Sequence, residues 1–406
     1  MSSKTLFHRI FSQIDAASFA VEYWDGEIIR YGDETETFIL QLKDENICSA
    51  VLSNLSVNFG EAYMCGAIDI LGDMQSLIKL TYLVDYDKFT LTLPEKIRMA
   101  AMAWRQRNTL SRARRNIAHH YDVGNDFFSL WLGREMAYSC AYFQTTEDDI
   151  DTAQRQKFEH ICRKLHLKKG ETLIDVGCGW GGLAIHAAQQ YGVEVLGITL
   201  SQEQKKLADE RIAASGLEGR VRVELMDYRE IPSNACFDKV VSVGMLEHVG
   251  RENMKAYFNI LSRVLKEGGV GVVQSIGRMF ELPVNPWITK YIFPGMYLPT
   301  LADMAVPLGK CDLNITDVEV LRLHYAMTLD KWAAAFEQNI DKIREMYSES
   351  FVRMWRFYLN MCSVSFRYGE ICLWQVQFTR GLNNSLPLTR DYLYSSRTEF
   401  TSGVRE

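Results

Sequence analysis

Short apolar runs alternate with helix-like stretches through the middle of the chain. Five runs have the length of strands, at 171–176, 193–198, 221–225, 239–243 and 270–274. Stretches with helical spacing of apolar residues lie between them, at 183–191, 202–215 and 252–267. This alternation predicts an α/β fold built on a mostly parallel, doubly wound sheet.

The two ends of the chain have different patterns. Before about residue 90, alternating runs such as 38–42 occur with turn signals at Asp25-Gly26 and Gly32-Asp33, which predicts a small N-terminal α+β domain. After about residue 310 the chain becomes aromatic, at spacings that predict helices with buried faces. These aromatic residues are Trp332, Phe336, Tyr347, Phe351, Trp355, Tyr358 and Phe366.

Composition narrows the class of protein. The 406 residues are 47% hydrophobic and 24% charged, so the chain is globular and long enough for two domains. A net charge of -6 argues against a dedicated nucleic-acid-binding protein. Nine cysteines without a CxxC pair predict free thiols in a reducing cytoplasm, and they predict no metal site.

Nothing in the sequence predicts a membrane-spanning or exported segment. Residues 1–11 lack the apolar core and cleavage site of a signal peptide. No run reaches the roughly 18 apolar residues that a spanning helix needs. We therefore expect a cytoplasmic protein that meets a membrane, if at all, from its surface.

One segment is basic, although the chain as a whole carries a net negative charge. Residues 96–115 contain basic side chains and no acidic ones: Lys96, Arg98, Arg105, Arg107, Arg112, Arg114 and Arg115. Such a run is compatible with a solvated linker between two domains. It is equally compatible with contact to anionic lipid, where each Lys or Arg contributes about 1 kcal/mol. Charge alone leaves both interpretations open.

A glycine-rich loop, Asp-Val-Gly-Cys-Gly-Trp-Gly-Gly at 175–182, follows the first strand of the alternating region. Glycines let the backbone turn sharply beside a ligand, and the helix that follows offers free amide groups. A dinucleotide site would need an acidic residue where the second strand ends, but the chain reads Gly-Ile-Thr-Leu-Ser at 197–201. Asp175 suits the positively charged sulfonium of S-adenosylmethionine better than a pyrophosphate, so the loop predicts a site for that cofactor.

Further motifs follow in a fixed order along the chain. They include His-Tyr-Asp-Val-Gly-Asn-Asp at 120–126, Tyr-Ser-Cys-Ala-Tyr at 138–142, Gly-Met-Leu-Glu-His-Val-Gly at 244–250 and Tyr-Ala-Met-Thr-Leu at 325–329. With the glycine-rich loop, they resemble the cyclopropane-fatty-acyl-phospholipid synthases and their mycolic-acid methyltransferase relatives. The resemblance covers roughly residues 115–380, and more loosely 59–63. It implies a class I S-adenosylmethionine-dependent methyltransferase, with a Rossmann-like doubly wound sheet.

The resemblance implies methyl transfer to the cis double bond of unsaturated acyl chains in membrane phospholipids. The alkene attacks the sulfonium methyl group and leaves a carbocation, and loss of a proton from the new methyl group closes a cyclopropane ring. The protein must therefore position an electrophile, exclude water and provide a base. Matching positions imply cofactor contacts from Tyr138, Ser139, Asp175, Gly177, Gly179, Thr199, Leu200, Gln204, Asp227 and Tyr228.

In this family a bound bicarbonate serves as the base. Its matching ligands here are the Cys140 backbone, Glu247, the Ile276 backbone and Tyr325. Glu247 can hold the proton-bearing oxygen of the anion, and Tyr325 can donate to an anionic oxygen. Cys362 matches a cysteine sometimes treated as catalytic in the family, although this mechanism needs no thiol.

One position departs from the family. Gln274 stands where the family usually has a histidine. A glutamine amide can still donate to bicarbonate, but it cannot relay a proton. Slower deprotonation would favour a methyl-branched or methylene product over the ring, so both outcomes stay open. The neighbouring His248 would point away from Glu247 if this segment were extended.

The expected domain organisation follows the resemblance. Residues 1–95 would form a module for lipid engagement or dimerisation, 96–118 a basic linker and 119–406 the catalytic domain. An insertion at about 280–320 would accept the acyl chain, because Trp287, Ile292, Phe293, Pro294 and Tyr297 cluster there. We expect a homodimer, peripherally bound to the inner face of the membrane. Two alternatives are a methyltransferase for small-molecule amines and a non-catalytic lipid-binding protein.

Overall fold

The chain packs into two compact units in the computed structural model, which describes residues 3–14, 17–45, 51, 55–83 and 123–394. The first unit comprises Met1–Gln106, Leu282–Met296 and Tyr325–Ile371, and the second comprises Arg107–Glu281, Tyr297–His324 and Cys372–Glu406. The basic run at 96–115 lies outside the described residues. The predicted domain boundaries and the role of each domain stay predictions.

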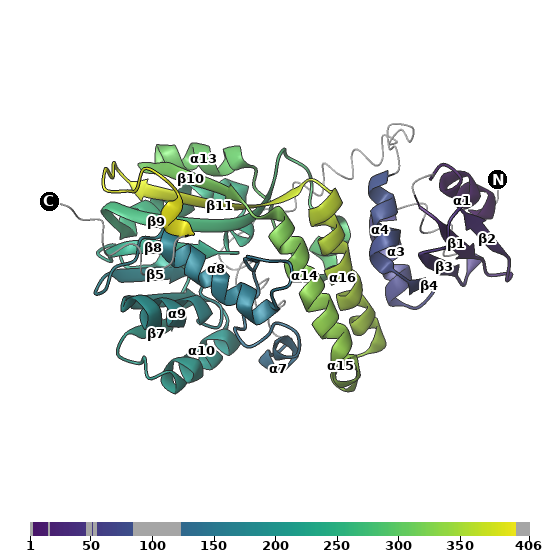
Figure 1. Ribbon diagram of the computed structural model, residues 1–406, viewed down its shortest axis with the longest axis horizontal. Helices are drawn as coiled ribbons and strands as arrows, with labels where there is room; N and C mark the ends of the chain where they lie inside the picture. The colour runs from purple at the N-terminus through teal and green to yellow at the C-terminus, as the bar shows by residue number, and fades with distance from the viewer. Residues whose placement is uncertain (1–2, 15–16, 46–50, 52–54, 84–122, 395–406) are drawn as a thin grey trace. The chain divides into compact units, whose positions relative to one another are not determined.

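A seven-stranded sheet forms the centre of the second unit, in the order β10-β11-β9-β8-β5-β6-β7. In Figure 1 the labels β10, β11, β9, β8, β5 and β7 follow that order from top to bottom. Neighbours among β5 to β9 pair in parallel, and β10 pairs with β11 in antiparallel register. The predicted α/β fold with a mostly parallel, doubly wound sheet is confirmed. The strands are β5 (Thr172–Val176), β6 (Glu194–Thr199), β7 (Val221–Leu225), β8 (Phe237–Val243), β9 (Leu265–Arg278), β10 (Leu313–Val320) and β11 (Ile371–Arg380).

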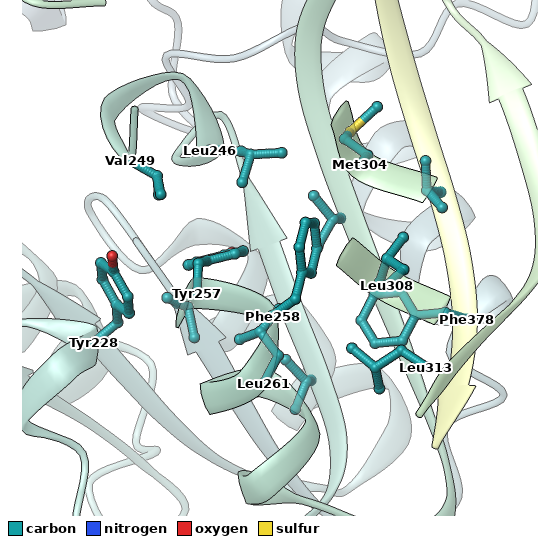
Figure 2. Packing of buried hydrophobic residues seen from close by; sticks show 14 of the residues in the cluster. Tyr228, Leu246, Val249, Tyr257, Phe258, Leu261, Met304, Leu308, Leu313 and Phe378 are labelled. Carbon is teal, nitrogen blue, oxygen red and sulfur yellow. The ribbon is translucent and has the colours of Figure 1, made fainter. Parts of the chain in front are cut away.

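Helices cover both faces of this sheet. Residues of α8 (Ile150–Lys164), α9 (Gly182–Tyr191) and α10 (Gln202–Ala214) pack with Leu173 in one apolar cluster. Residues of α11 (Met254–Val264) and α13 (Leu301–Lys310) pack with Ile174 in another. Figure 2 shows Phe258, Leu308 and Phe378 meeting in this second cluster. Because adjacent residues of one strand are buried on opposite faces, the strands read as continuous apolar runs.

The structure differs from the predicted elements at three places. The helix predicted at 252–267 ends at Val264, because β9 already begins at Leu265. The prediction of helices after residue 310 missed β10 and β11. A register shift between Ile315 and Asp317 interrupts the alternation of β10, and β11 is buried along nearly its whole length, so neither strand shows a clear period of two.

Part of the predicted acyl-chain insertion belongs to the sheet itself. Met304, Leu308 and Leu313 lie in the second apolar cluster, so α13 and β10 are structural elements of the α/β fold. Within 280–320, the stretch assigned to the first unit is Leu282–Met296, which contains α12 (Pro286–Tyr291). That this stretch lines an acyl channel stays a prediction.

The first unit confirms the small N-terminal α+β fold. Its four-stranded sheet has the order β2-β1-β3-β4 and consists of β1 (Phe19–Glu22), β2 (Ile28–Tyr31), β3 (Phe38–Leu42) and β4 (Ile68–Gly72). Besides α12, its described helices are α1 (Ser3–Phe11), α3 (Leu55–Met64), α4 (Met74–Leu83), most of α14 (Arg322–Gln338), α15 (Ile340–Met346) and α16 (Glu349–Tyr368). Among the described residues, no helix is both long and apolar enough to cross a membrane.

Segments far apart in the sequence meet inside the first unit. Arg353 of α16 donates from Nη2 to the Ile68 carbonyl at 2.7 Å, and its guanidinium lies 4.0 Å from the Tyr63 ring centre. Glu61 of α3 accepts from Lys290 Nζ at 2.5 Å and from the Tyr291 hydroxyl at 2.8 Å. These contacts attach α12 and α16 to the N-terminal α+β domain.

Gly60 provides a test of this packing. A Cβ atom at Gly60 would lie 2.4 Å from Nε1 of the fully buried Trp287. Alanine normally stabilises a helix relative to glycine, but here overpacking should destabilise the protein by about 1–3 kcal/mol. We expect Gly60→Ala to lower the midpoint of urea unfolding. Gly309→Ala is the matched control, because that helical glycine is exposed and has open space around it. Equal midpoints for the two variants would contradict this packing.

Candidate active site

A cavity opens at the carboxyl ends of the central strands of the second unit. All of the predicted cofactor residues line it: Tyr138, Ser139, Asp175, Gly177, Gly179, Thr199, Leu200, Gln204, Asp227 and Tyr228. Ligands of doubly wound folds bind at this edge of the sheet, where the connecting loops emerge. The structure therefore brings these side chains together, while their individual contacts with the cofactor stay predictions.

The glycine-rich loop is held open beside the cavity. The amides of Gly177 and Cys178 both donate to the Ile198 carbonyl at 3.0 Å, which fixes the loop on β6. Gly177 has φ 88°, and a Cβ atom there would lie 3.0 Å from Met245. A Cβ atom at Gly179, with φ 56°, would meet nothing within 4 Å. The loop thus leaves room for a ligand close to its backbone.

Hydrogen bonds fix the residues predicted to hold the ribose. Thr199 Oγ1 donates to Gln204 Oε1 at 2.7 Å. The Ser201 side chain caps α10 by accepting a hydrogen bond from the backbone amide of Gln204. Because its Oε1 is engaged, Gln204 keeps its NH₂ group as a donor. This arrangement stands where a dinucleotide-binding fold would have a carboxylate.

The predicted adenine end includes a cation that the sequence did not single out. Arg229 donates from Nε to Asp227 Oδ1 at 2.7 Å and from Nη2 to Asp227 Oδ2 at 2.8 Å. The same guanidinium lies 5.2 Å from the ring centre of Tyr228. Burial raises the pKa of Tyr228 to about 12, so its hydroxyl stays protonated at neutral pH. Arg229 thus fixes both predicted adenine contacts.

Two ionisable groups are buried at the inner wall of the cavity. Asp175 is 1% exposed, and its Oδ2 has no hydrogen-bond partner among the described residues. Burial raises its pKa to about 7. Lys157 of α8 also lines the cavity, and sequence reasoning missed it. The available signal was its position between Ala153 and Ile161, one helical turn from each on the buried face.

Glu247 lies in a short 3₁₀ turn, Leu246–His248, that follows β8. Its Oε1 accepts from the Ile276 amide at 2.6 Å, and its Oε2 has no hydrogen-bond partner among the described residues. Burial raises the pKa of Glu247 to about 7, against the lowering effect of the Ile276 amide. One carboxylate oxygen is therefore fixed, and the other is available to a ligand.

Gln274 and Ile276 lie on β9 beside this carboxylate. Gln274 Oε1 accepts from Gln375 Nε2 at 2.9 Å, which leaves Nε2 of Gln274 as the donor end of its amide. The Gln274 carbonyl accepts from Gly244, which lines the cavity. The Ile276 amide is occupied by Glu247, so its observed role is to orient that side chain. Its predicted direct contact with bicarbonate stays a prediction.

The other predicted catalytic residues lie in different surroundings. Cys140 is buried in the second unit, and its Sγ donates to the Ala141 carbonyl at 3.2 Å. Tyr325 belongs to the first unit, where its ring lies 4.6 Å from that of Phe366. Cys362 lies on α16, and burial raises the pKa of its thiol to about 12. A thiol with this pKa is protonated at neutral pH and is a poor nucleophile.

The condition attached to the expectation for His248 is not met. The segment around Glu247 forms a 3₁₀ turn and is not extended, and His248 lines the same cavity as the glycine-rich loop. Burial lowers the pKa of His248 to about 4, so the imidazole is neutral at physiological pH. A neutral side chain here adds no charge that would repel a cationic cofactor.

The strand order and the glycine-rich loop after β5 are those of a class I S-adenosylmethionine-dependent methyltransferase. Within this class, the chain belongs to the mycolic acid cyclopropane synthetase family, whose model matches residues 108–376. Residues 6–103 match the model of a domain of unknown function.

Similar proteins agree with this assignment. A probable fatty acid methyltransferase from Pseudomonas putida is 37% identical over 92% of this chain and 95% of its own. The cyclopropane-fatty-acyl-phospholipid synthase of Escherichia coli K12 is 38% identical over 86% of this chain and 90% of its own. Among solved structures, the mycolic acid cyclopropane synthase CmaA1, complexed with SAH and CTAB, has a TM-score of 0.63 at 32% identity, covering 68% of this chain and 99% of that one.

The chain is therefore an enzyme that uses S-adenosylmethionine for cyclopropane formation or methyl transfer on lipid acyl chains. This excludes the non-catalytic lipid-binding alternative. The suggested family resemblance, the fold class and S-adenosylmethionine as cofactor are confirmed.

Proposed function

We propose that this enzyme transfers a methylene group from S-adenosylmethionine to the cis double bond of unsaturated acyl chains in membrane phospholipids, with bound bicarbonate as base. The observation that carries the proposal is Glu247, a buried carboxylate with one oxygen fixed by Ile276 and the other free. Phospholipid as substrate is supported by the name of the E. coli relative, which this chain matches over 90% of its length.

The residues present fit both small molecules. When bound, S-adenosylmethionine supplies an electrophilic methyl group, and the cavity lined by the glycine-rich loop would hold it. Bicarbonate would supply a base that removes a proton, and Glu247, the Cys140 backbone and Gln274 of the second unit would hold it. The free Oε2 of Glu247 can accept from a hydroxyl group, and Nε2 of Gln274 can donate to an anionic oxygen.

The burial of this site suits a reaction that passes through a cationic intermediate. Glu247 is 2% exposed, and Gln274 is 1% exposed, so bulk water has little access to either group. Excluding water protects a reactive cation from hydration and strengthens the hydrogen bonds that orient the base. Glu247 acts here as a fixed acceptor in its ionised form.

The test is incubation with S-adenosylmethionine and vesicles of an unsaturated phospholipid, followed by mass spectrometry and NMR of the acyl chains. We expect cyclopropane product, with a lower rate in buffer depleted of bicarbonate. Turnover of a free fatty acid or a soluble amine, with none of vesicle phospholipid, would contradict the proposed substrate. An unchanged rate after bicarbonate depletion would contradict the proposed base.

A methylene product, or a methyl-branched alkene left when the cation loses a proton from a neighbouring chain carbon, is the second candidate. The observation that favours it is Gln274, whose amide cannot relay a proton. The P. putida relative is named as a fatty acid methyltransferase, without mention of a ring. The same NMR measurement separates the two products, because a ring and a branch have different proton signals.

We also propose that the enzyme is a cytoplasmic homodimer bound peripherally to anionic lipid through its basic run. Replacing Arg112, Arg114 and Arg115 with Gln removes three charges worth about 1 kcal/mol each, so binding should weaken by about 100-fold at low salt. The measurement is cosedimentation with vesicles of phosphatidylglycerol. The matched control replaces the exposed Arg30, Arg222 and Arg344, which gives the same change in net charge. Equal weakening in both variants would show that net charge, not this run, governs binding.

A further inference from the structure

Lys157 is a buried lysine that the proposed chemistry does not use. It lies on α8, is 2% exposed and lines the cofactor cavity. Its Nζ donates to Ser139 Oγ at 2.9 Å and lies 4.7 Å from the Phe158 ring centre. A lysine ammonium has three donors, and Ser139 takes one of them. The ammonium group therefore has further N–H donors, and it lies on the wall of a ligand site.

Other buried lysines of the second unit are paired differently. Lys164 Nζ lies 2.6 Å from Glu319 Oε2, and Lys239 Nζ lies 3.6 Å from Glu171 Oε1. Lys157 forms no such ion pair with any residue that the structure describes. Since burying an unpaired charge is costly, a position on a cavity wall indicates that the partner is a ligand.

The second unpaired group on this wall has the opposite charge. Asp175 is buried, lines the same cavity and has a free Oδ2. The two groups attract each other, so each shifts the pKa of the other. Lys157 lowers the pKa of Asp175, and Asp175 raises the pKa of Lys157. Burial shifts each pKa in the opposite direction. The wall thus presents an amine and a carboxyl group, both ionisable and each with unused hydrogen-bonding capacity.

The cofactor has a matching pair of charges. Its amino-acid end is a zwitterion, with an α-carboxylate and an α-ammonium group on one carbon atom. We propose that Lys157, together with the Ser139 hydroxyl that it orients, binds the α-carboxylate, while Asp175 faces the α-ammonium group. Because Ser139 Oγ accepts from Lys157, its own hydroxyl proton is free to be donated to the same carboxylate.

This assignment separates recognition of the amino-acid end from recognition of the nucleoside. The predicted nucleoside contacts, Gln204 and Tyr228, have hydrogen-bond or ring partners of their own that do not include Lys157. A ligand without the amino-acid part should therefore be insensitive to Lys157. S-adenosylhomocysteine and 5′-methylthioadenosine form such a pair of probes, because the second has the same adenosine and sulfur but no amino acid.

The experiment is isothermal titration calorimetry of both probes with the full-length protein. We expect Lys157→Met to weaken S-adenosylhomocysteine binding by about 10- to 100-fold, in keeping with the loss of charge-assisted hydrogen bonds. Affinity for 5′-methylthioadenosine should stay within about twofold. Lys239→Met is the matched control, a buried lysine that does not line the cavity, and it should change neither affinity.

Lys157→Gln keeps the proposal testable where the methionine variant does not fold, because its amide can still donate to Ser139 without a charge. It should show the same selective loss. Equal weakening of both probes would show that Lys157 only supports the fold, and unchanged binding of both would show that it contacts neither. Since no lipid takes part, these results are independent of the proposed phospholipid substrate.

Discussion

Replacing Glu247 with Gln should reduce turnover of acyl chains by about 10²- to 10⁴-fold, the usual contribution of acid–base catalysis. The amide keeps the size of the side chain, and its oxygen can still accept from Ile276. The group at the position of Oε2, however, becomes an NH₂ donor where the proposed bicarbonate needs an acceptor. The measurement is product formation from vesicle phospholipid by mass spectrometry.

The affinity for S-adenosylhomocysteine separates a catalytic defect from a folding defect. It should stay within about twofold in Glu247→Gln, because the predicted cofactor contacts come from other residues of the cavity. Glu194→Gln, an exposed carboxylate at the start of β6, is the control and should retain full turnover. Unchanged product in Glu247→Gln would remove Glu247 from the proposed base site.

The pH dependence of the wild type gives a second readout of Glu247. Burial raises its pKa to about 7, so turnover should fall as the pH falls below 7 and the carboxylate takes up a proton. The effect of Glu247 on protein stability changes with pH in the opposite direction. Because the folded-state pKa lies above the unfolded value, the contribution of Glu247 to the free energy of unfolding decreases as the pH rises from about 4.5 through 7. Glu247→Gln should remove this contribution, whereas Asp175, whose pKa is also raised, keeps a contribution of the same sign.

The cofactor cavity could be predicted from the sequence because its residues depend on local chain geometry. The glycine-rich loop directly follows β5, and Thr199 ends β6. Parallel strands place their carboxyl ends at one edge of the sheet, so residues that follow them necessarily meet there. The same rule placed Asp227, which follows β7, on the wall of the cavity.

Features that depend on long-range packing could not be predicted in this way. Lys157 reaches the cavity because α8 packs across the sheet, a fact that no motif in α8 expresses. Gln375 holds Gln274 from a strand about 100 residues later in the chain. Strands β10 and β11 were missed for a related reason, since one is an irregular edge strand and the other is buried on both sides.

Replacing Gln274 with His should shift the product toward the cyclopropane ring, raising the ratio of ring to methyl-branched or methylene product by about tenfold. The imidazole can accept and pass on a proton, whereas the amide of Gln274 can only donate or accept hydrogen bonds. Faster proton removal competes better with other fates of the cationic intermediate, and a tenfold effect lies below the usual range for a positioned base. Gln375 Nε2, which now donates to Gln274 Oε1, can donate to an unprotonated ring nitrogen in its place.

The ratio is measured by NMR of the acyl chains after a single incubation, so it does not depend on the amount of active enzyme. Gln274→Asn is the matched control, because it shortens the amide without adding a group that can take up a proton; it should lower the rate and leave the ratio unchanged. An equal ratio in Gln274→His and the wild type would mean that residue 274 does not act in deprotonation. Glutamine in place of the family's histidine would then affect only how the buried Gln274–Gln375 pair packs between β9 and β11. Of these two residues, Glu247 and Gln274, only Glu247 would then orient the base.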